Sequence, residues 1–163
     1  MKIIKKAQGI NKINPKNDKI LAVIPNKVLG MFQKLDDITF DCWEMKGLTK
    51  GQELKYEMLY LFETSDLFSE LDINYTIFSN FVTKIQQGYH QNPYHTCLHA
   101  FDVVQTTNFM IKKCNFQELA DLSYVELASM YVAAACHDVD HPGHNNIYAI
   151  NAQIDLALRY NGI

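Results

Sequence analysis

Histidine is concentrated in two short segments of this chain. Five of its six histidines lie in NPYHTCLHAFDVVQ (residues 92–105) and HDVDHPGH (residues 137–144). Histidine can bind a metal ion as a neutral ligand and can transfer a proton near neutral pH. A metal site needs several nitrogen or oxygen donors that converge on one point. A histidine pair four residues apart in one segment and an adjacent His-Asp in the other can supply them, so the pattern predicts metal chemistry.

The first segment is predicted to lie on a helix. Asn92 suits the N-cap position, and Pro93 suits the first helical position, where its fixed φ is favourable. On that helix, His95, His99 and Asp102 recur at the spacing of a single face. Asp102 could either orient a site histidine or make a contact with another helix.

The second segment follows another predicted helix. This helix opens with Ser123 and Glu126 at the spacing of a capping box, and it carries His137 and Asp138 to its C-terminal end. The carboxylate of Asp138 has two oxygens, so it could be shared by two metal ions. A histidine that stands beside the ions without binding them would remain free to protonate a leaving oxygen.

Apolar residues recur at helical spacing in three further segments. One helix is predicted after Thr49 and Gln52, which have capping-box spacing; a second is predicted to end at Gly88; and a last one to be capped by Asn145 or Asn146. The positions expected to face the core are Leu54, Met58, Leu61, Phe62, Ile77, Phe78, Phe81, Val82, Ile85, Ile147, Ile150, Ile154 and Leu158. There is no long alternating strand pattern and no internal repeat, so the sequence predicts an all-α fold.

Length and composition indicate one domain with a basic N-terminal arm. The chain has 163 residues, 48% of them hydrophobic, which suits a single globular domain. Residues 1–17 hold five lysines and no acid, so we expect a flexible arm at 1–17 and the folded part at 18–163. The net charge of -3 gives no basic footprint for nucleic acid. The four cysteines form no C-x-x-C pair, which argues against a zinc knuckle or a disulfide framework.

We expect the chain to be cytoplasmic. No apolar run reaches the roughly 18 residues that a membrane span needs, and the start lacks the apolar core of a signal peptide. Association of a longer parent protein with a membrane remains open.

The two histidine segments resemble the signature of the class I 3',5'-cyclic nucleotide phosphodiesterases. The resemblance is carried by NPYHTCLHAFDVVQ, by AACHDVDHPGHNN and by GYHQ just before the first of them, and it extends from about Asp36 to the last residue. It implies the front part of an all-helical, metal-dependent phosphohydrolase domain of the HD type. The implied reaction is hydrolysis of cyclic AMP, cyclic GMP or both to nucleoside 5'-monophosphates by a two-metal mechanism, in signal transduction.

The same resemblance implies a role for individual residues. His95 corresponds to the general acid that protonates the O3' leaving group. The residues that correspond to metal ligands are His99, His137 and Asp138. The residues that correspond to positions beside the metals or in the substrate pocket are Tyr94, His141 and Asn146. The implied cofactors are two divalent ions, zinc together with magnesium or manganese, with Asp138 shared between them.

The chain also departs from the family pattern. Thr96 stands where the family usually has asparagine, so support of the neighbouring site is expected to differ. In the family the catalytic domain continues beyond the position of Ile163, and that part carries a further Asp ligand and the groups that hold the base. We therefore expect a C-terminal remainder of the domain as a partner, and little or no activity from this chain alone. Two alternatives stay open: a non-catalytic helical fragment that binds a partner, and another HD-type nucleotide phosphohydrolase.

Overall fold

Every regular element in the part of the chain that the structure describes is a helix. The computed structural model describes residues 21–160, so the basic arm expected at 1–17 lies outside the described residues. The helices are α2 (Asn26–Phe32), α3 (Cys42–Thr49), α4 (Glu53–Thr64), α5 (Leu67–Glu70), α6 (Tyr75–Gln87), α7 (Cys97–Lys113), α8 (Phe116–Leu119), α9 (Tyr124–Cys136), α10 (Asn146–Asn151) and α11 (Asp155–Arg159). The prediction of an all-α fold is confirmed.

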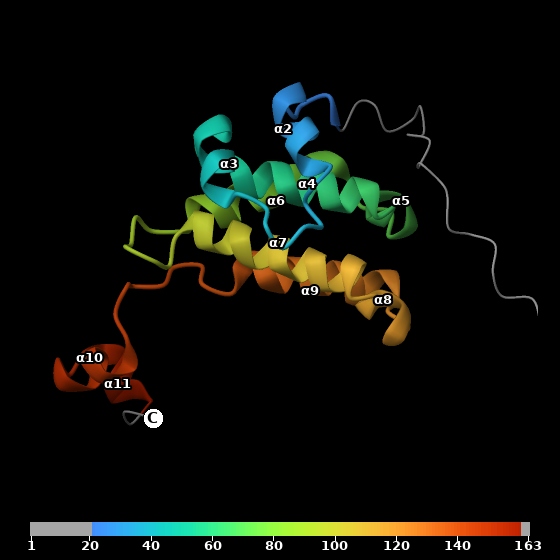
Figure 1. The fold of residues 1–163 in the computed structure, drawn as a ribbon. Helices are drawn as coiled ribbons and strands as arrows, with labels where there is room; N and C mark the ends of the chain where they lie inside the picture. Colours follow the sequence, from blue (N-terminus) through green and yellow to red (C-terminus); the bar gives the residue numbers. More distant parts are fainter. Residues whose placement is uncertain (1–20, 161–163) are drawn as a thin grey trace, which may run out of the picture.

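The core forms where α4, α7 and α9 meet. α7 packs against both α9 and α4, and α6 packs against α4; Figure 1 shows α7 and α9 side by side, with α4 and α6 above them. The side chains at the centre include Phe62 of α4, Phe101 of α7 and Tyr131 of α9, all of them almost completely buried. Burial of such large apolar side chains is the main favourable contribution to folding. It also fixes α7 and α9, which carry the two histidine segments, relative to each other.

Buried polar groups add directional contacts between these helices. The Tyr131 hydroxyl donates a hydrogen bond to Asn108 Oδ1 over 2.9 Å. Gln105 Nε2 donates to the carbonyl oxygens of Leu35 and Asp37. Buried polar groups need such partners because leaving them unpaired is costly. The bonds therefore define how α9 and the loop after α2 dock on α7.

The two predicted capping boxes have different outcomes. The box at the start of α9 is confirmed: the Ser123 hydroxyl accepts from the Glu126 N–H, and the Glu126 carboxylate accepts from the Ser123 N–H. The box predicted from Thr49 and Gln52 is wrong. Thr49 is the last residue of α3, and its hydroxyl donates to the Glu53 carboxylate at 2.9 Å instead. A sequence spacing alone does not tell the end of one helix from the start of the next.

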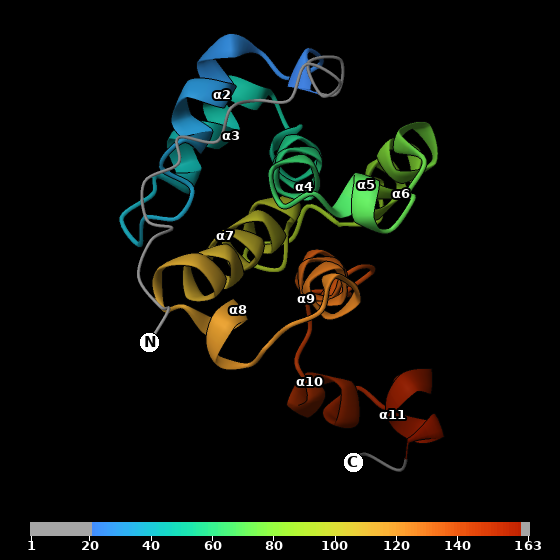
Figure 2. The ribbon, with the colours of Figure 1, turned by 90° about the vertical axis from the view of Figure 1, so that its right-hand side faces the viewer.

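The predicted core faces are only partly confirmed. α6 ends at its C-cap Gly88 as predicted, but Ile77 is 70% exposed and Phe81 is 42% exposed. The last predicted helix is in fact two short ones, because Gln153 adopts a left-handed φ of 50°. Figures 1 and 2 show α10 and α11 set apart from the other helices. Their apolar side chains, such as Ile147 at 69% exposed, do not enter the core.

Candidate metal and proton-transfer site

The first histidine segment lies partly in a loop and partly on α7. The helix begins at Cys97, so the prediction that Asn92 caps it is wrong. The Asn92 amide instead donates to the carbonyl oxygens of His95 and His141. His99 therefore lies in the first turn of α7, whereas His95 lies in the preceding loop. The two imidazoles are not neighbours on one helical face: their centroids are 6.2 Å apart and the ring planes are perpendicular.

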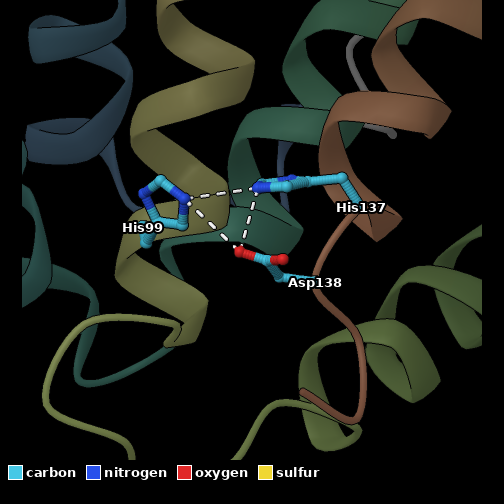
Figure 3. Close-up of side chains that lie close together, drawn as sticks. All are labelled: His99, His137 and Asp138. Atoms are coloured by element: carbon cyan, nitrogen blue, oxygen red, sulfur yellow. Dashed lines mark hydrogen bonds and ion pairs between the residues drawn. The ribbon is translucent and has the colours of Figure 1, made fainter. Parts of the chain in front are cut away.

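Three donor atoms converge where α7 meets the C-terminal end of α9 (Figure 3). His99 Nε2 lies 3.2 Å from His137 Nε2 and 3.5 Å from Asp138 Oδ2, and His137 Nε2 lies 3.2 Å from that same oxygen. Zinc binds histidine nitrogen at about 2.0–2.1 Å, so two ligand atoms of a tetrahedral site stand about 3.3 Å apart. The observed spacing therefore fits a single ion. Among residues 21–160, this is the only group of three such donors that is close enough to hold one.

The ring of His137 is held in the tautomer that a metal ligand needs. His137 is the C-cap residue of α9, and its Nδ1 lies 2.8 Å from the carbonyl oxygen of Ala134. A carbonyl oxygen only accepts, so Nδ1 carries a proton, and in the neutral imidazole the lone pair is then on Nε2. A hydrogen bond from the second ring nitrogen commonly orients a histidine ligand in this way. The final turn of α9 thus directs Nε2 at the other two donors.

Burial favours the neutral form of His99. Loss of hydration lowers the pKa of its imidazole, and the nearby His137 lowers it further, while Asp138 opposes the shift. The His99 side chain is 15% exposed and that of Asp138 is 17% exposed. Only a neutral imidazole can bind a metal ion, so this environment favours the competent state.

His95 lies beside the three donors and not among them. Its ring stacks on that of His141, with centroids 3.8 Å apart and planes 18° apart. The ring of Tyr94 lies 5.1 Å from His95 and 4.4 Å from His99. Gly143 N–H donates to His141 Nδ1 at 3.0 Å. His95 and His141 therefore form one pair of parallel imidazoles at the edge of the donor group.

Two hollows border these residues. His95, His141 and His144 line a surface depression together with Asn145, Asn146 and Ile147 at the start of α10. Tyr94 and His99 line a cavity of about 530 Å³ that extends to the N-terminus of α3. The structure thus brings together the predicted ligands and His95, with the three neighbouring residues around them.

Asp102 and Thr96 take structural positions. Asp102 Oδ1 accepts a hydrogen bond from Cys42 Sγ at 3.3 Å, which is a contact between α7 and α3 and not a bond to a site histidine. Thr96 is the N-cap residue of α7, but its hydroxyl makes no capping hydrogen bond. The start of α7 therefore has no side-chain cap.

Two supporting groups were missed from the sequence. The carbonyl of Ala134 orients His137, and a backbone oxygen leaves no trace in the residue type. The Asn92 side chain ties two loops together, yet asparagine before proline is equally typical of a helix start. For the Ala134 carbonyl, the only signal in the sequence was that a histidine follows directly after an apolar helix.

Known proteins are similar to this chain in sequence. Residues 94–163 match the family described as 3'5'-cyclic nucleotide phosphodiesterase. The chain is 40% identical over 123 residues to 3',5'-cyclic-AMP phosphodiesterase 4 of Dictyostelium discoideum. The aligned part covers 75% of this chain and 12% of that protein. It is 32% identical over 154 residues to the high affinity cGMP-specific 3',5'-cyclic phosphodiesterase 9A of Homo sapiens, which covers 93% of this chain and 25% of that protein.

The fold is shared with a solved phosphodiesterase structure. LmjPDEB1 in complex with IBMX matches with a TM-score of 0.74 and 21% sequence identity, over 93% of this chain and 44% of that one. The chain thus spans less than half the length of each of these proteins. No helix in residues 21–160 is long and apolar enough to cross a membrane. From its sequence matches and its fold, the chain belongs to the class I 3',5'-cyclic nucleotide phosphodiesterase family and corresponds to part of the family's catalytic domain.

Proposed function

We propose that this chain supplies the metal-binding and proton-donating part of a centre that hydrolyses 3',5'-cyclic nucleotides to nucleoside 5'-monophosphates. The observation that carries the proposal is the convergence of His99 Nε2, His137 Nε2 and Asp138 Oδ2 within 3.5 Å of one another. Family membership implies a cyclic nucleotide substrate and divalent metal ions. Hydrolysis of such a diester needs a water nucleophile, stabilisation of negative charge on the phosphoryl oxygens and a proton for the leaving oxygen.

The donor set suits zinc. Two imidazole nitrogens and one carboxylate oxygen are a common ligand set for a catalytic zinc ion, which keeps a further position open. Asp138 has a second carboxylate oxygen, through which it would share a second ion, magnesium or manganese. When bound, the ions would polarise the phosphoryl group and activate water.

His95 would donate the proton to the departing O3'. A general acid must stand close to the reacting centre without being consumed as a ligand. The place of His95 beside the three donors, with its ring 6.2 Å from that of His99, supports this role. Stacking against His141 restricts its ring. Asn146 lines the same depression and would contact the substrate, and Tyr94 packs between His95 and His99.

We further propose that the 163-residue chain alone hydrolyses cyclic nucleotides slowly or not at all. Residues 21–160 bring three donors together, and two ions held by a single shared carboxylate need additional oxygen ligands. The large apolar side chains of α10 and α11, namely Ile147, Ile150, Leu156 and Leu158, are exposed, so in this chain they do not enclose a pocket for a base. Rapid metal-dependent hydrolysis of cyclic AMP or cyclic GMP by the purified chain would contradict this expectation.

The hydrolytic role is tested in a chimera. This chain is fused to the C-terminal part of the catalytic domain of the Dictyostelium relative, and cleavage of cyclic AMP and cyclic GMP is measured with zinc and magnesium. His95→Ala is expected to lower kcat by about 10²- to 10⁴-fold, the usual contribution of a general acid, while zinc binding persists. Met110→Ala is the control, because Met110 is exposed on α7 and lines neither of the two hollows. Unchanged kcat in His95→Ala would overturn the assignment.

A further inference from the structure

The loop before α7 and the loop after α9 contact each other repeatedly. We call this contact, between residues 88–95 and residues 139–143, the loop pair. The Asp140 N–H donates to the Gly88 carbonyl at 3.0 Å, and His90 Nε2 lies 2.7 Å from Asp140 Oδ1. A Cβ on Gly88 would stand 2.9 Å from Val139 Cγ1. The absence of a side chain at Gly88 thus allows the close approach.

Asn92 makes the contact of the loop pair that reaches both site histidines. Its amide nitrogen donates to the carbonyl oxygen of His141 at 2.8 Å and to that of His95 at 3.3 Å. A side-chain amide nitrogen has two hydrogens, so both are used. Asn92 Oδ1 faces Gly143, where an added Cβ would stand only 2.7 Å away, and Gly143 has a φ of 81°. The side chain is therefore fixed on both sides.

We propose that Asn92 is a positioning residue that holds the loop of His95 against the loop of His141 and thereby sets the stack of the two imidazoles. The hydrogen-bonded carbonyls belong to the same two residues whose rings lie 3.8 Å apart. Among residues 21–160, no other side chain donates to both of these loops. The value of this arrangement for proton transfer rests on the function proposed above, but the arrangement itself does not.

This role is separate from that of the metal ligands. His99 is held by α7, and His137 is held by the end of α9 through the Ala134 carbonyl. Asn92 bonds to neither residue. A defect at Asn92 should therefore displace His95 and His141 while the three metal donors keep their spacing, which a general loss of structure would not do.

The test uses Asn92→Asp in the 163-residue chain, because aspartate keeps the size of asparagine but lacks both donor hydrogens. The matched control is Gln91→Ala, at the exposed neighbouring position. In carbon-13 histidine-labelled protein, the parent and the control are expected to show a nuclear Overhauser effect between the His95 and His141 rings. Asn92→Asp is expected to lose it, with zinc affinity within about threefold of the parent, since the ligands are unchanged.

A second variant approaches the same contact from the other loop. Gly143→Ala keeps Asn92 but pushes a methyl group against its amide, and it is expected to give the same loss of ring contact if Asn92→Asp is too unstable to study. A ring contact that persists in these variants would overturn the proposal. The proposal would also be overturned if the variants lost zinc affinity together with the ring contact, by clearly more than the threefold stated above. Asn92 would then support the whole site and not the two imidazoles in particular.

The chimera adds a kinetic readout. Misplacing a reacting group by about 1 Å can cost on the order of 100-fold in rate, so Asn92→Asp is expected to lower kcat by about 10- to 100-fold with KM nearly unchanged. If every chimera is inactive, the proposed hydrolysis fails while the ring contact still decides the role of Asn92. Full kcat in Asn92→Asp together with a lost ring contact would contradict the positioning role.

Discussion

Replacing His99 by alanine should abolish tight metal binding. His99 contributes one of three donors, with its Nε2 3.2 Å from His137 Nε2 and 3.5 Å from Asp138 Oδ2. Four-ligand zinc sites contribute about 10–16 kcal/mol of apparent binding free energy, or about 2.5–4 kcal/mol per ligand if the ligands share it evenly. Because 1.4 kcal/mol is about tenfold in affinity, His99→Ala should weaken zinc binding by roughly 10²- to 10³-fold.

The assay is competition between the purified chain and a chromophoric zinc chelator. Cobalt provides a second readout, because its visible absorption reports the number and geometry of the ligands. His144→Ala is the matched control, since His144 lies outside the donor group and stacks on Tyr148, and its zinc affinity should equal that of the parent. Zinc affinity in His99→Ala within threefold of the parent would refute the assignment of these residues as one site.

Further predictions concern stability and its dependence on pH. Tyr131→Phe should cost about 1–3 kcal/mol of unfolding free energy in chemical denaturation, because it leaves the buried Asn108 oxygen without its donor; an unchanged midpoint would contradict this. Ser123→Ala should cost about 1 kcal/mol by loss of the confirmed cap, while Ser129→Ala serves as the comparison. Burial, followed by the nearby acidic groups, raises the pKa of Glu57 in the folded state, so the parent loses stability as pH rises above about 4.3. The advantage of Glu57→Gln should therefore grow from about pH 5 to about pH 8 in parallel denaturation curves, and a constant difference would argue against a raised pKa.

The metal-free chain should also lose stability in acid because of His99. Its pKa is lowered in the folded state, by burial first and by His137 second. The unfolded chain therefore binds more protons as pH falls through about 6.5, and the free energy of unfolding should decrease from there downward. The decrease should be smaller in His99→Gln. Zinc should raise stability near neutral pH and make the decrease steeper, because its ligands must stay deprotonated while the unfolded chain takes up protons. An equal decrease in both proteins would show that other groups cause it.

The sequence predicted the grouping of the donor atoms better than the elements that carry them. The two histidine segments predicted metal chemistry, the family resemblance implied His99, His137 and Asp138 as the ligands, and the structure brings these three donors together. The helix start at Asn92 could not be predicted correctly, because asparagine before proline suits both a helix cap and a loop, and only the carbonyls of a segment about 50 residues away decide between them. The exposure of Ile77 and Ile147 likewise depends on which helices lie opposite them. The spacing of apolar residues along the sequence carries no information about that.

The error at Asn92 bears directly on how the site works. With the predicted helix start, His95 and His99 would have moved as one rigid unit. In the structure the three candidate ligands lie at helix ends fixed by a buried core, through contacts such as that of Tyr131 with Asn108, whereas His95 lies in a loop. We therefore expect the proposed metal binding and proton donation to depend on different contacts. A substitution of Asn92 in the loop pair should slow catalysis while metal affinity is kept. A substitution at the contact between α7 and α9 should lower metal affinity first.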